Sequence, residues 1–352
     1  MHALAVALLA LAAPPEHTPV FTSGADGYHT YRIPALVATP KGKLLAFAEA
    51  RKKGQGDAGN IDLVLKRSTD GGKTWSPQEV LWDDEDNTCG NPCPIVDRDT
   101  GVIWLLLTHN LGAEHEGVIS SGKAQRGRTV WVTHSTDDGA TWAKPIEITA
   151  DTKKEGWTWY ATGPGAGIQT RAGRLIAPCD HKTPNGDGYS HVIYSDDHGK
   201  SWKTGGVTGP GGNECRIVEL ADGKLLLNMR NHKPSKEKTR GIAESTDGGL
   251  TWSQMTHDKT LIEPICQGTL IPVGKQFLFI NPAGAKRENL TARLSDDCRT
   301  WSHSKVIFAG PSAYSDAAVL PNGQVACLFE RGEKHPYETI SLAVFSLDWV
   351  RE

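Results

Sequence analysis

Several short motifs in the chain combine arginine, tyrosine and carboxylate side chains that could carry chemistry. A guanidinium group forms a planar fork that matches a carboxylate and keeps its charge at physiological pH. A tyrosine becomes a nucleophile near neutral pH only when a neighbouring base takes its proton. The motifs are Tyr31-Arg32-Ile33-Pro34, Glu49-Ala50-Arg51 with Gly56-Asp57, Glu214-Cys215-Arg216, Leu227-Asn228-Met229-Arg230, Asn281-Pro282 with Arg287, Tyr314-Ser315-Asp316 and Tyr337-Glu338. Because they are scattered over the chain, a fold must bring them together.

No motif has the spacing of a metal site of the C-x-x-C or H-E-x-x-H kind. His109, Glu114, His115 and Glu116 do cluster, but they lie on a polar stretch that contains glycine. That setting favours solvated loop residues over metal ligands. The sequence also contains no recognisable calcium loop, and we expect neither a metal nor a cofactor.

An internal repeat supplies the elements that must position these motifs. Four copies have the same spacing of Ser, Asp, Gly and Trp, and they are Ser68–Trp75, Ser135–Trp142, Ser195–Trp202 and Ser245–Trp252. A fifth copy, Ser295–Trp301, is one residue short and lacks the glycine. The aspartate accepts hydrogen bonds from its own turn, the glycine supplies a positive φ, and the tryptophan packs beneath the turn.

Short runs of alternating or β-branched residues lie between the copies, and they indicate strands joined by hairpins. Antiparallel sheets that recur at such intervals are typical of a β-propeller. Five repeats mark five blades, Ser302–Glu352 supplies a sixth, and a strand near Val20–Ala38 closes the ring. We therefore predict an all-β fold, a six-bladed β-propeller of four-stranded antiparallel sheets, with seven blades as the alternative.

The repeats resemble the Asp boxes of sialidases, but several unrelated propellers also contain Asp boxes, so they specify a fold and not an activity. The motifs are more specific. Tyr31–Pro34 resembles the sialidase signature F/Y-R-I-P, and the remaining motifs resemble other active-site segments of that family, in the family's order. The resemblance covers essentially the whole mature chain. It implies an exo-α-sialidase (neuraminidase) of bacterial type, a retaining glycoside hydrolase that releases terminal α-linked sialic acid and needs no cofactor.

The resemblance assigns Arg32, Arg230 and Arg287 to the sugar's carboxylate, which lies directly on the anomeric carbon. It makes Tyr314 the nucleophile and Glu214 its base. A neutral tyrosine avoids the repulsion that an anionic nucleophile would meet from the substrate carboxylate. Any one of these side chains alone would more simply be a surface or core residue, but their presence together in matching motifs favours a site.

Asp57 is expected to act first as general acid and then as general base, on the polar loop Lys52–Asn60. Asp62 is its nearest rival, but it falls in an alternating strand pattern. The resemblance also places Arg51 beside the pocket and gives Glu338 the task of steadying the first arginine. The alternatives are an exposed loop for Asp57 and a surface salt bridge for Arg51.

The substrate's exact identity stays open. Asp180 and His181 stand where sialidases often carry small or aromatic pocket residues, so they could reshape the region that receives the acetamido or glycerol arm. The acid released could be N-acetylneuraminic acid, its glycolyl form or the deaminated nonulosonic acid. A trans-sialidase would need an acceptor platform, and a non-catalytic Asp-box propeller that binds an acidic glycan or a protein would have no reason to keep the arginines, the Tyr/Glu pair and the acid.

The balance of charge argues against nucleic acid as a partner. The chain has 38 basic and 41 acidic residues among 352, a balance that argues against nucleic-acid binding through bulk charge. We expect a sialylated glycan, glycoprotein or glycolipid as the partner and no stable membrane insertion, and the oligomeric state stays open.

The N-terminus predicts export. Ala3–Ala13 is an apolar run too short to span a bilayer, although His2 replaces the usual Lys or Arg. We predict a signal peptide at residues 1–13, one propeller domain at 14–352 and a secreted or periplasmic (cell-envelope) location. The seven cysteines leave at least one unpaired, and Cys89 and Cys93 could form a local disulfide or be two half-buried thiols.

Overall fold

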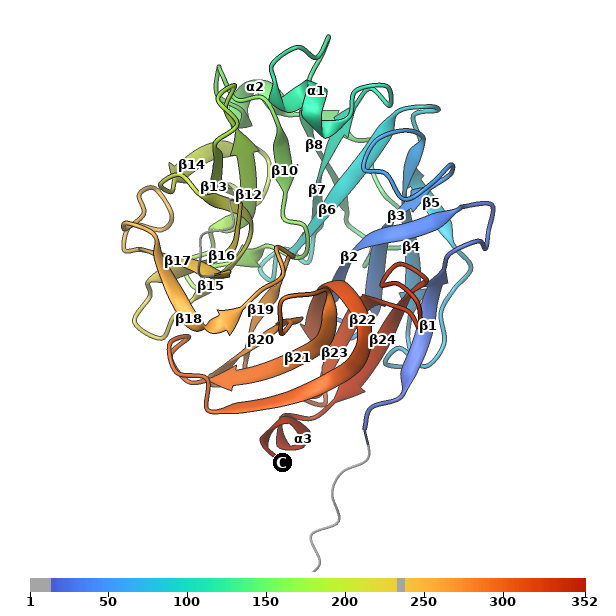
Figure 1. Ribbon diagram of the computed structural model, residues 1–352, viewed down its shortest axis with the longest axis vertical. Helices are drawn as coiled ribbons and strands as arrows, with labels where there is room; N and C mark the ends of the chain where they lie inside the picture. Colours follow the sequence, from blue (N-terminus) through green and yellow to red (C-terminus); the bar gives the residue numbers. More distant parts are fainter. Residues whose placement is uncertain (1–13, 233–237) are drawn as a thin grey trace, which may run out of the picture.

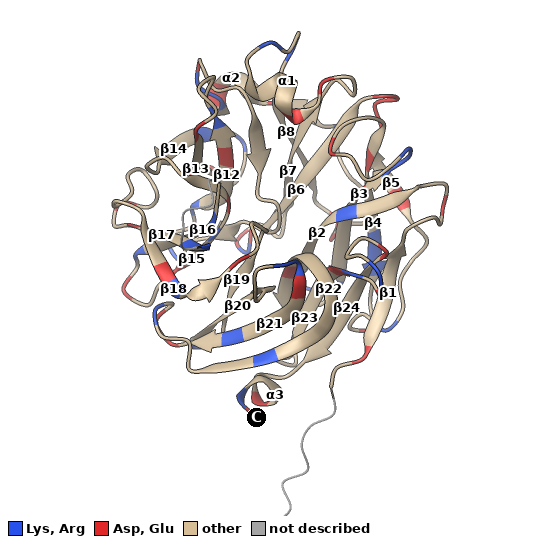
Figure 2. Cartoon of the chain, in the orientation of Figure 1, with Lys and Arg blue, Asp and Glu red and all other residues tan. Residues whose placement is uncertain are grey.

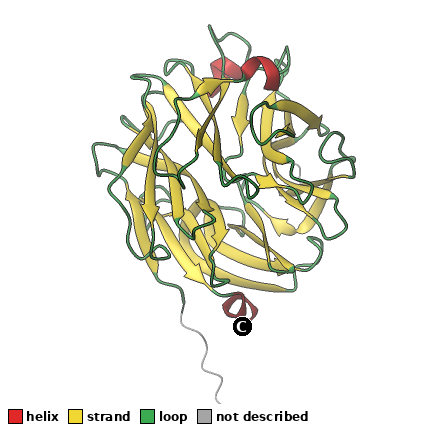
Figure 3. Ribbon diagram, turned by 180° about the vertical axis from the view of Figure 1, so that it is seen from behind, coloured by secondary structure: helices red, strands yellow, loops and turns green. Residues whose placement is uncertain are grey.

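The computed structural model describes residues 14–232 and 238–352, in which strands succeed one another around a ring (Figure 1). The predicted signal peptide, residues 1–13, lies outside the described residues. Seen from behind, the ring consists of strands and loops, with short helices at its edge (Figure 3). Figure 2 shows Lys, Arg, Asp and Glu scattered over the ring, and neither sign gathers on the face in view.

Among the described residues, four sheets make up the ring. The eight-stranded sheet consists of β2 (Thr30–Ala38), β3 (Leu44–Arg51), β4 (Ile61–Ser68), β5 (Glu79–Trp82), β6 (Thr88–Val96), β7 (Ile103–Asn110), β8 (Thr129–Ser135) and β9 (Ile146–Glu147). The five-stranded sheet consists of β10 (Tyr160–Thr162), β11 (Ile168–Gln169), β12 (Leu175–Lys182), β13 (Gly188–Ser195) and β14 (Lys203–Val207). The four-stranded sheet consists of β15 (Gly212–Glu219), β16 (Leu225–Asn231), β17 (Thr239–Ser245) and β18 (Thr256–Ile262).

The fourth sheet joins the two ends of the chain. Its seven strands are β1 (His17–Thr22), β19 (Thr269–Val273), β20 (Gln276–Pro282), β21 (Glu288–Ser295), β22 (His303–Val319), β23 (Val325–Arg331) and β24 (Thr339–Phe345). The helices are α1 (Glu116–Ser120), α2 (Thr149–Thr152) and α3 (Leu347–Arg351). No helix in the described part of the chain is long and apolar enough to cross a membrane.

The two large sheets each contain two antiparallel meanders. In the eight-stranded sheet a single parallel pair, Ile61 with Thr88, joins them. In the seven-stranded sheet the 17-residue β22 serves both, because its first part pairs with β21 and its last part with β23. The all-β propeller is thus confirmed. The number of blades stays a prediction, and the six four-stranded groups of these pairings are compatible with six.

The ring closes between the first and the last strand of the chain. Strand β1 pairs antiparallel with β24, from His17 opposite Ala343 to Thr22 opposite Thr339. We expected a closing strand near Val20–Ala38, and β1 overlaps the start of that range. The remainder of the range contains β2, which is the first strand of the first meander.

The Asp boxes have the hydrogen bonds that their sequence predicts. In the first box, the backbone N–H of Gly72 donates to Ser68 Oγ at 2.9 Å, and Thr74 donates to Asp70 through its backbone N–H at 3.0 Å and its hydroxyl at 2.6 Å. The glycine approaches the neighbouring sheet so closely that a Cβ at Gly72 would collide with Leu342 of β24. Each box therefore both closes its own hairpin and packs against the preceding meander. In the irregular fifth box Cys298 takes the positive φ, at 57°.

Of the two alternatives for Cys89 and Cys93, the local disulfide is wrong, and both thiols are fully buried instead of half-buried. All seven cysteines are free and buried. Cys89 and Cys93 both lie on β6, but they face different apolar clusters: Cys89 packs with Leu105, and Cys93 packs with Trp104. Strict alternation would put both on one face, but the bulge between Gly90 and Cys93 turns Cys93 to the opposite side of the strand and so keeps the two thiols apart.

The histidine–glutamate cluster forms no shared site. His109 Nε2 lies 2.7 Å from Asp84 Oδ2, whereas Glu114 accepts from backbone N–H groups such as that of Gly127 at 3.3 Å. Glu116 forms an ion pair with Lys182. His109, Glu114 and Glu116 therefore each have a separate protein partner, as ordinary loop residues do.

Candidate active site

Four first strands of the meanders carry a β-bulge at the same end of the ring. The register shifts between Arg32 and Ala35 in β2, between Gly90 and Cys93 in β6, between Gly212 and Cys215 in β15, and between Ser312 and Ser315 in β22. A bulge inserts an extra residue and re-aims the side chains around it. Arg32, Glu214 and Tyr314 lie at three of these bulges, so the predicted motifs coincide with the irregular positions.

The bulge in β2 includes a strained residue. Ile33 has φ = 57° although it is β-branched, and its backbone N–H donates to Glu330 Oε1 at 2.9 Å. A β-branched residue rarely adopts this conformation unless its surroundings impose it, and such residues concentrate at functional sites. The buried carboxylate of Glu330 imposes it here.

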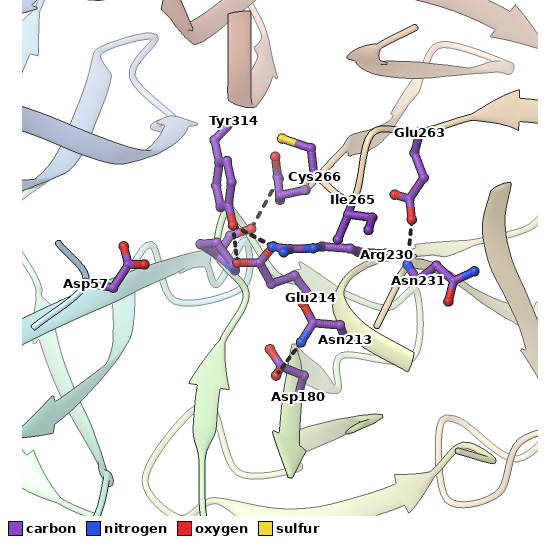
Figure 4. A network of polar contacts seen from close by, with 12 residues as sticks. Asp57, Asp180, Asn213, Glu214, Arg230, Asn231, Glu263, Ile265, Cys266 and Tyr314 are labelled. Atoms are coloured by element: carbon purple, nitrogen blue, oxygen red, sulfur yellow. Dashed lines mark hydrogen bonds and ion pairs between the residues drawn. The ribbon is translucent and has the colours of Figure 1, made fainter. Parts of the chain in front are cut away.

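Tyr314, Glu214 and Arg230 meet at the centre of the site (Figure 4). The Tyr314 hydroxyl lies 2.7 and 2.9 Å from the two oxygens of Glu214. Arg230 donates from one nitrogen both to Glu214 at 2.6 Å and to Tyr314 at 2.8 Å. The phenol therefore has a base for its proton and a cation for the charge that would remain.

The three predicted arginines line one cavity with Tyr314 between them. The guanidinium of Arg32 lies 5.1 Å and that of Arg287 lies 5.6 Å from the centre of the Tyr314 ring. Arg287 donates to the Tyr337 hydroxyl at 2.8 Å and to the Ile265 carbonyl at 3.0 Å. We call Arg32, Arg230 and Arg287 the arginine clamp.

The expectation that Glu338 steadies Arg32 is wrong, because Glu330 does so. Glu330 accepts from Arg32 Nε at 3.0 Å and from a second guanidinium nitrogen at 3.3 Å. It also accepts from the backbone N–H of Tyr314 at 3.1 Å, so one buried carboxylate positions an arginine and the tyrosine. Glu338 instead accepts from the backbone N–H groups of Glu333, Lys334 and His335 at 2.9–3.2 Å, and this fixes the turn that presents Tyr337.

Tyr337 is a site residue that the sequence analysis mentioned without giving it a role. Its ring centre lies 4.0 Å from the Arg32 guanidinium, and its hydroxyl accepts from Arg287. It therefore links two members of the clamp. The only signal in the sequence was its position directly before the glutamate of the last motif.

Asp57 lies across the cavity from the Tyr314–Glu214 pair (Figure 4). Its Oδ1 is 2.7 Å from a nitrogen of Arg51 and 3.6 Å from a nitrogen of Arg32, and its side chain is 59% exposed. Arg51 is itself fixed by Glu49 at 2.6 Å. The rival Asp62 lies on β4, where it accepts from the Tyr28 hydroxyl at 2.5 Å.

Burial and neighbouring charges together shift the pKa values of Tyr314 and Asp57. Burial raises the pKa of Tyr314 well above its ordinary value; Glu214 adds to this increase, whereas Arg230 and Arg287 oppose it. Partial removal from water raises the pKa of Asp57, but the attraction of Arg51 and Arg32 outweighs it and leaves the net value below the ordinary one. Both groups are therefore tuned by the arginines that would bind an incoming anion.

The cavity has a volume of about 430 Å³, and it is lined by Arg32, Arg51, Asp57, Glu214, Arg230, Arg287 and Tyr314. This volume lies in the range of small-molecule sites. A second cavity, of about 1060 Å³, is lined by Leu36, Val218 and Ala318, which lie four residues further along the same strands. It therefore opens at the other end of the ring and contains none of these seven side chains.

Asp180 and His181 are separated by the alternation of β12. Asp180 lines the cavity and lies 3.3 Å from the Asn213 amide, and burial raises its pKa well above the ordinary value. His181 points the other way, where its ring stacks on Trp157 with centres 3.5 Å apart. Only Asp180 can therefore touch a bound ligand.

Four further residues line the cavity although the sequence motifs predicted no role for them. Glu49, Asn91, Arg128 and Trp159 line the wall formed by the first three meanders. Glu49 was quoted only as part of a motif, and the others had no motif signal. Nothing in local sequence marks such residues, because they reach the cavity through the packing of whole sheets.

Comparisons with known proteins agree with this geometry. Residues 42–327 match the family of BNR repeat-like domains. The chain is 35% identical to a sialidase of Micromonospora viridifaciens over 94% of the chain and 55% of the relative. It is 31% identical to an exo-alpha-sialidase of Aspergillus fumigatus over 92% of the chain and 86% of the relative. A solved structure, the Hadza microbial sialidase Hz136, superposes with a TM-score of 0.86 at 28% identity, over 95% of this chain and 69% of that one. The chain thus spans little more than half the length of the Micromonospora relative.

Proposed function

Because the chain belongs to the sialidase family, we propose that it is an exo-α-sialidase that hydrolyses terminal α-linked sialic acids with retention of configuration. The observation that carries the proposal is the Tyr314–Glu214–Arg230 contact inside a cavity that also contains Arg32, Arg287 and Asp57. An anion-binding cluster of arginines around a tyrosine and its base matches a sugar whose carboxylate sits on the reacting carbon.

Substrate binding would raise the pKa of Asp57, the proposed general acid. When the substrate carboxylate binds the clamp, it gives Arg32 a second negative partner besides Asp57. Asp57 then loses part of the attraction that lowers its pKa. Its protonated form becomes more populated next to the leaving-group oxygen, as a general acid requires.

In the first step Glu214 takes the phenolic proton of Tyr314, and the phenolate oxygen attacks the anomeric carbon. The bond to the leaving sugar breaks as Asp57 gives its proton to the glycosidic oxygen. Proton transfer from Tyr314 to Glu214 moves one negative charge without creating another, and Arg230 contacts both oxygens throughout. The step therefore avoids placing an extra charge in a buried site.

In the second step Asp57, now ionised, accepts a proton from a water molecule whose oxygen attacks the same carbon. The bond to Tyr314 breaks, and the phenolate regains its proton from Glu214. Two displacements at one carbon retain the configuration. Water is consumed, and the cycle leaves Glu214, Tyr314 and Asp57 in the protonation states in which they began.

We also propose that residues 1–13 direct export, that 14–352 act as one domain outside the cytoplasm, and that sialylated glycoconjugates are the substrates. The apolar run Ala3–Ala13 and the family's chemistry support these points.

The test is release of a fluorophore from a 2-α-linked sialic acid glycoside by the wild type, Tyr314→Phe and Tyr194→Phe. Tyr194 is a partly exposed tyrosine on β13 and serves as the control. We expect turnover by the wild type and by Tyr194→Phe, and a loss of about 10³-fold or more in Tyr314→Phe. Retained activity in Tyr314→Phe would exclude the tyrosine mechanism. A folded wild type that turns over neither this substrate nor the deaminated glycoside would favour a non-catalytic binding propeller.

A further inference from the structure

One cationic side chain in the cavity stands out because its guanidinium lacks a carboxylate or hydroxyl acceptor in the described part of the chain. Its counterparts are each bound: Arg32 by Glu330, Arg51 by Glu49, Arg230 by Glu214, Arg287 by Tyr337 and Lys182 by Glu116. Arg128 is 2% exposed, and its Nε is buried with no hydrogen-bond partner among residues 14–232 and 238–352. Its side chain therefore has donor capacity that the described protein does not use.

The surroundings of Arg128 direct this capacity into the cavity. Its guanidinium carbon lies 4.0 Å from the centre of the Trp159 ring, so one face is covered by the indole. Its backbone carbonyl accepts from Lys153 Nζ at 2.6 Å, which fixes the start of β8. The cavity is lined by Arg128 and Trp159 together. Since a guanidinium keeps its charge, the open N–H groups need an acceptor that the cavity must receive from outside.

The position of Arg128 in the ring identifies which part of a substrate it meets. Arg128 directly precedes β8. Strands β8 and β10 lie across the ring from β21, which directly follows Arg287, and from β22, which carries Tyr314 (Figure 1). In a six-membered sugar ring with its carboxylate on C2, the atom across the ring is C5. A sialic acid held by the clamp therefore turns its C5 substituent towards the Arg128 wall, and this step rests on the proposed function.

We propose that Arg128 binds the C5 substituent and selects acids in which that substituent presents a hydroxyl group. The hydroxyl can lie directly on C5, as in the deaminated acid, or at the end of a hydroxyacetyl amide. Its oxygen accepts from the Arg128 guanidinium, and its O–H can donate to a carboxyl group that lines the same cavity, such as Asp180. An N-acetyl substituent offers Arg128 one acceptor, its amide carbonyl, but it ends in a methyl group that can neither accept from Arg128 nor donate to a carboxyl group, so it satisfies less of the unused hydrogen-bonding capacity.

The test uses three fluorogenic α-glycosides that differ only at C5: N-acetyl, N-hydroxyacetyl and hydroxyl. The variant is Arg128→Met, and the control is Arg126→Met, because Arg126 is an exposed arginine two residues away that pairs with Glu147. We expect the wild type to cleave at least one hydroxyl-bearing substrate with a kcat/KM about tenfold or more above that of the N-acetyl substrate. Arg128→Met removes this preference while retaining cleavage of the N-acetyl substrate, and Arg126→Met keeps the preference.

A wild type that prefers the N-acetyl substrate overturns the proposal, and so does an Arg128→Met variant with an unchanged ratio or an equal loss on all three substrates. Because Arg128→Met could unfold, calorimetric titration of the wild type with the three free acids gives an independent ranking, in which a hydroxyl-bearing acid must bind most tightly. If the wild type cleaves none of the glycosides, the hydrolase fails, and this ranking still decides the role of Arg128.

Discussion

Asp57 and Arg51 show how neighbouring charges set the state of a single side chain in the empty site. Arg51 lies 2.7 Å from Asp57, and together with Arg32 it outweighs the effect of partial burial and leaves the pKa of Asp57 below its ordinary value. A general acid must be protonated to act, so the limb of kcat/KM that falls with rising pH reports this pKa in the free protein.

Replacing Arg51 by methionine should shift the falling part of the pH profile of kcat/KM to higher pH. Arg51 favours the ionised form of Asp57, so its removal raises the pKa of Asp57, and at any given pH more of the acid is protonated. We expect the falling limb of the normalised kcat/KM profile to shift to higher pH, although the absolute rate decreases. The measurement is the pH dependence of kcat/KM on a fluorogenic sialoside.

The control for this shift is Lys53→Met. Lys53 lies on the same loop but pairs with Asp86 at 3.2 Å, so its replacement removes the same charge without disturbing a contact of Asp57. A limb that stays in place in Arg51→Met, or that moves equally in the control, would contradict the assignment of Asp57 as the acid.

Residue identities in the site were largely predictable, whereas their contacts were not. Seven of the eight predicted side chains line one cavity, because Asp boxes and motif order already indicated a ring with its first strands around one centre. Glu338 was misplaced because Glu330 lies eight residues earlier on β23, and only the register of β23 against β22 brings its carboxylate to Arg32 and Tyr314. Arg128 lies in no motif, and it was singled out only because its Nε has no hydrogen-bond partner among the described residues.

The turn and the bulge are the two elements that convert a regular propeller into a site. The boxes could be predicted, because a serine, an aspartate and a glycine at fixed spacing determine their own hydrogen bonds. The bulges in β2, β6, β15 and β22 could not, because register depends on the partner strand. Local chemistry therefore determined the outer turns, and non-local pairing determined the ends of the strands that carry the side chains.

Two adjacent glycines in the first box distinguish two reasons for glycine in this turn, a positive φ and a close contact with the neighbouring sheet. Gly71 has φ = 76°, and a Cβ added there would meet no atom within 4 Å, whereas Gly72 has φ = 92° and would place a Cβ into Leu342. We expect Gly72→Ala to lower the free energy of unfolding by about 2–4 kcal/mol, from backbone strain and overpacking together. Gly71→Ala should lower it by only about 1 kcal/mol, from strain alone.

Urea denaturation followed by tryptophan fluorescence measures both values. The difference between the two variants isolates the contact between the box and the preceding meander. Equal effects of the two substitutions would show that the box closes its own hairpin only and contributes nothing to the neighbouring sheet.

At the scale of the whole molecule, the seam of the ring lies beside the site. Strand β1 pairs with β24, and on either side of this closure β2 carries Arg32, while β22 and β23 carry Tyr314 and Glu330. The hydrogen bond that Glu330 accepts from Arg32 joins the last meander to the first, and the one that it accepts from Tyr314 lies within the last meander. Closure of the ring and assembly of the site are therefore parts of one cooperative structure.

Phe21→Ala tests this coupling. Phe21 lies on β1, is fully buried and packs on Tyr31 with ring centres 5.4 Å apart. Its truncation should lower the free energy of unfolding by about 3–5 kcal/mol. Because the seam also positions Arg32 and Tyr314, sialidase activity and global tryptophan fluorescence should be lost at the same, lowered urea concentration. Ile146→Ala, at a side chain that is 61% exposed on β9, should change neither midpoint. If Phe21→Ala lost activity well before its fluorescence changed, the seam could open without the ring, and closure and site assembly would be separate events.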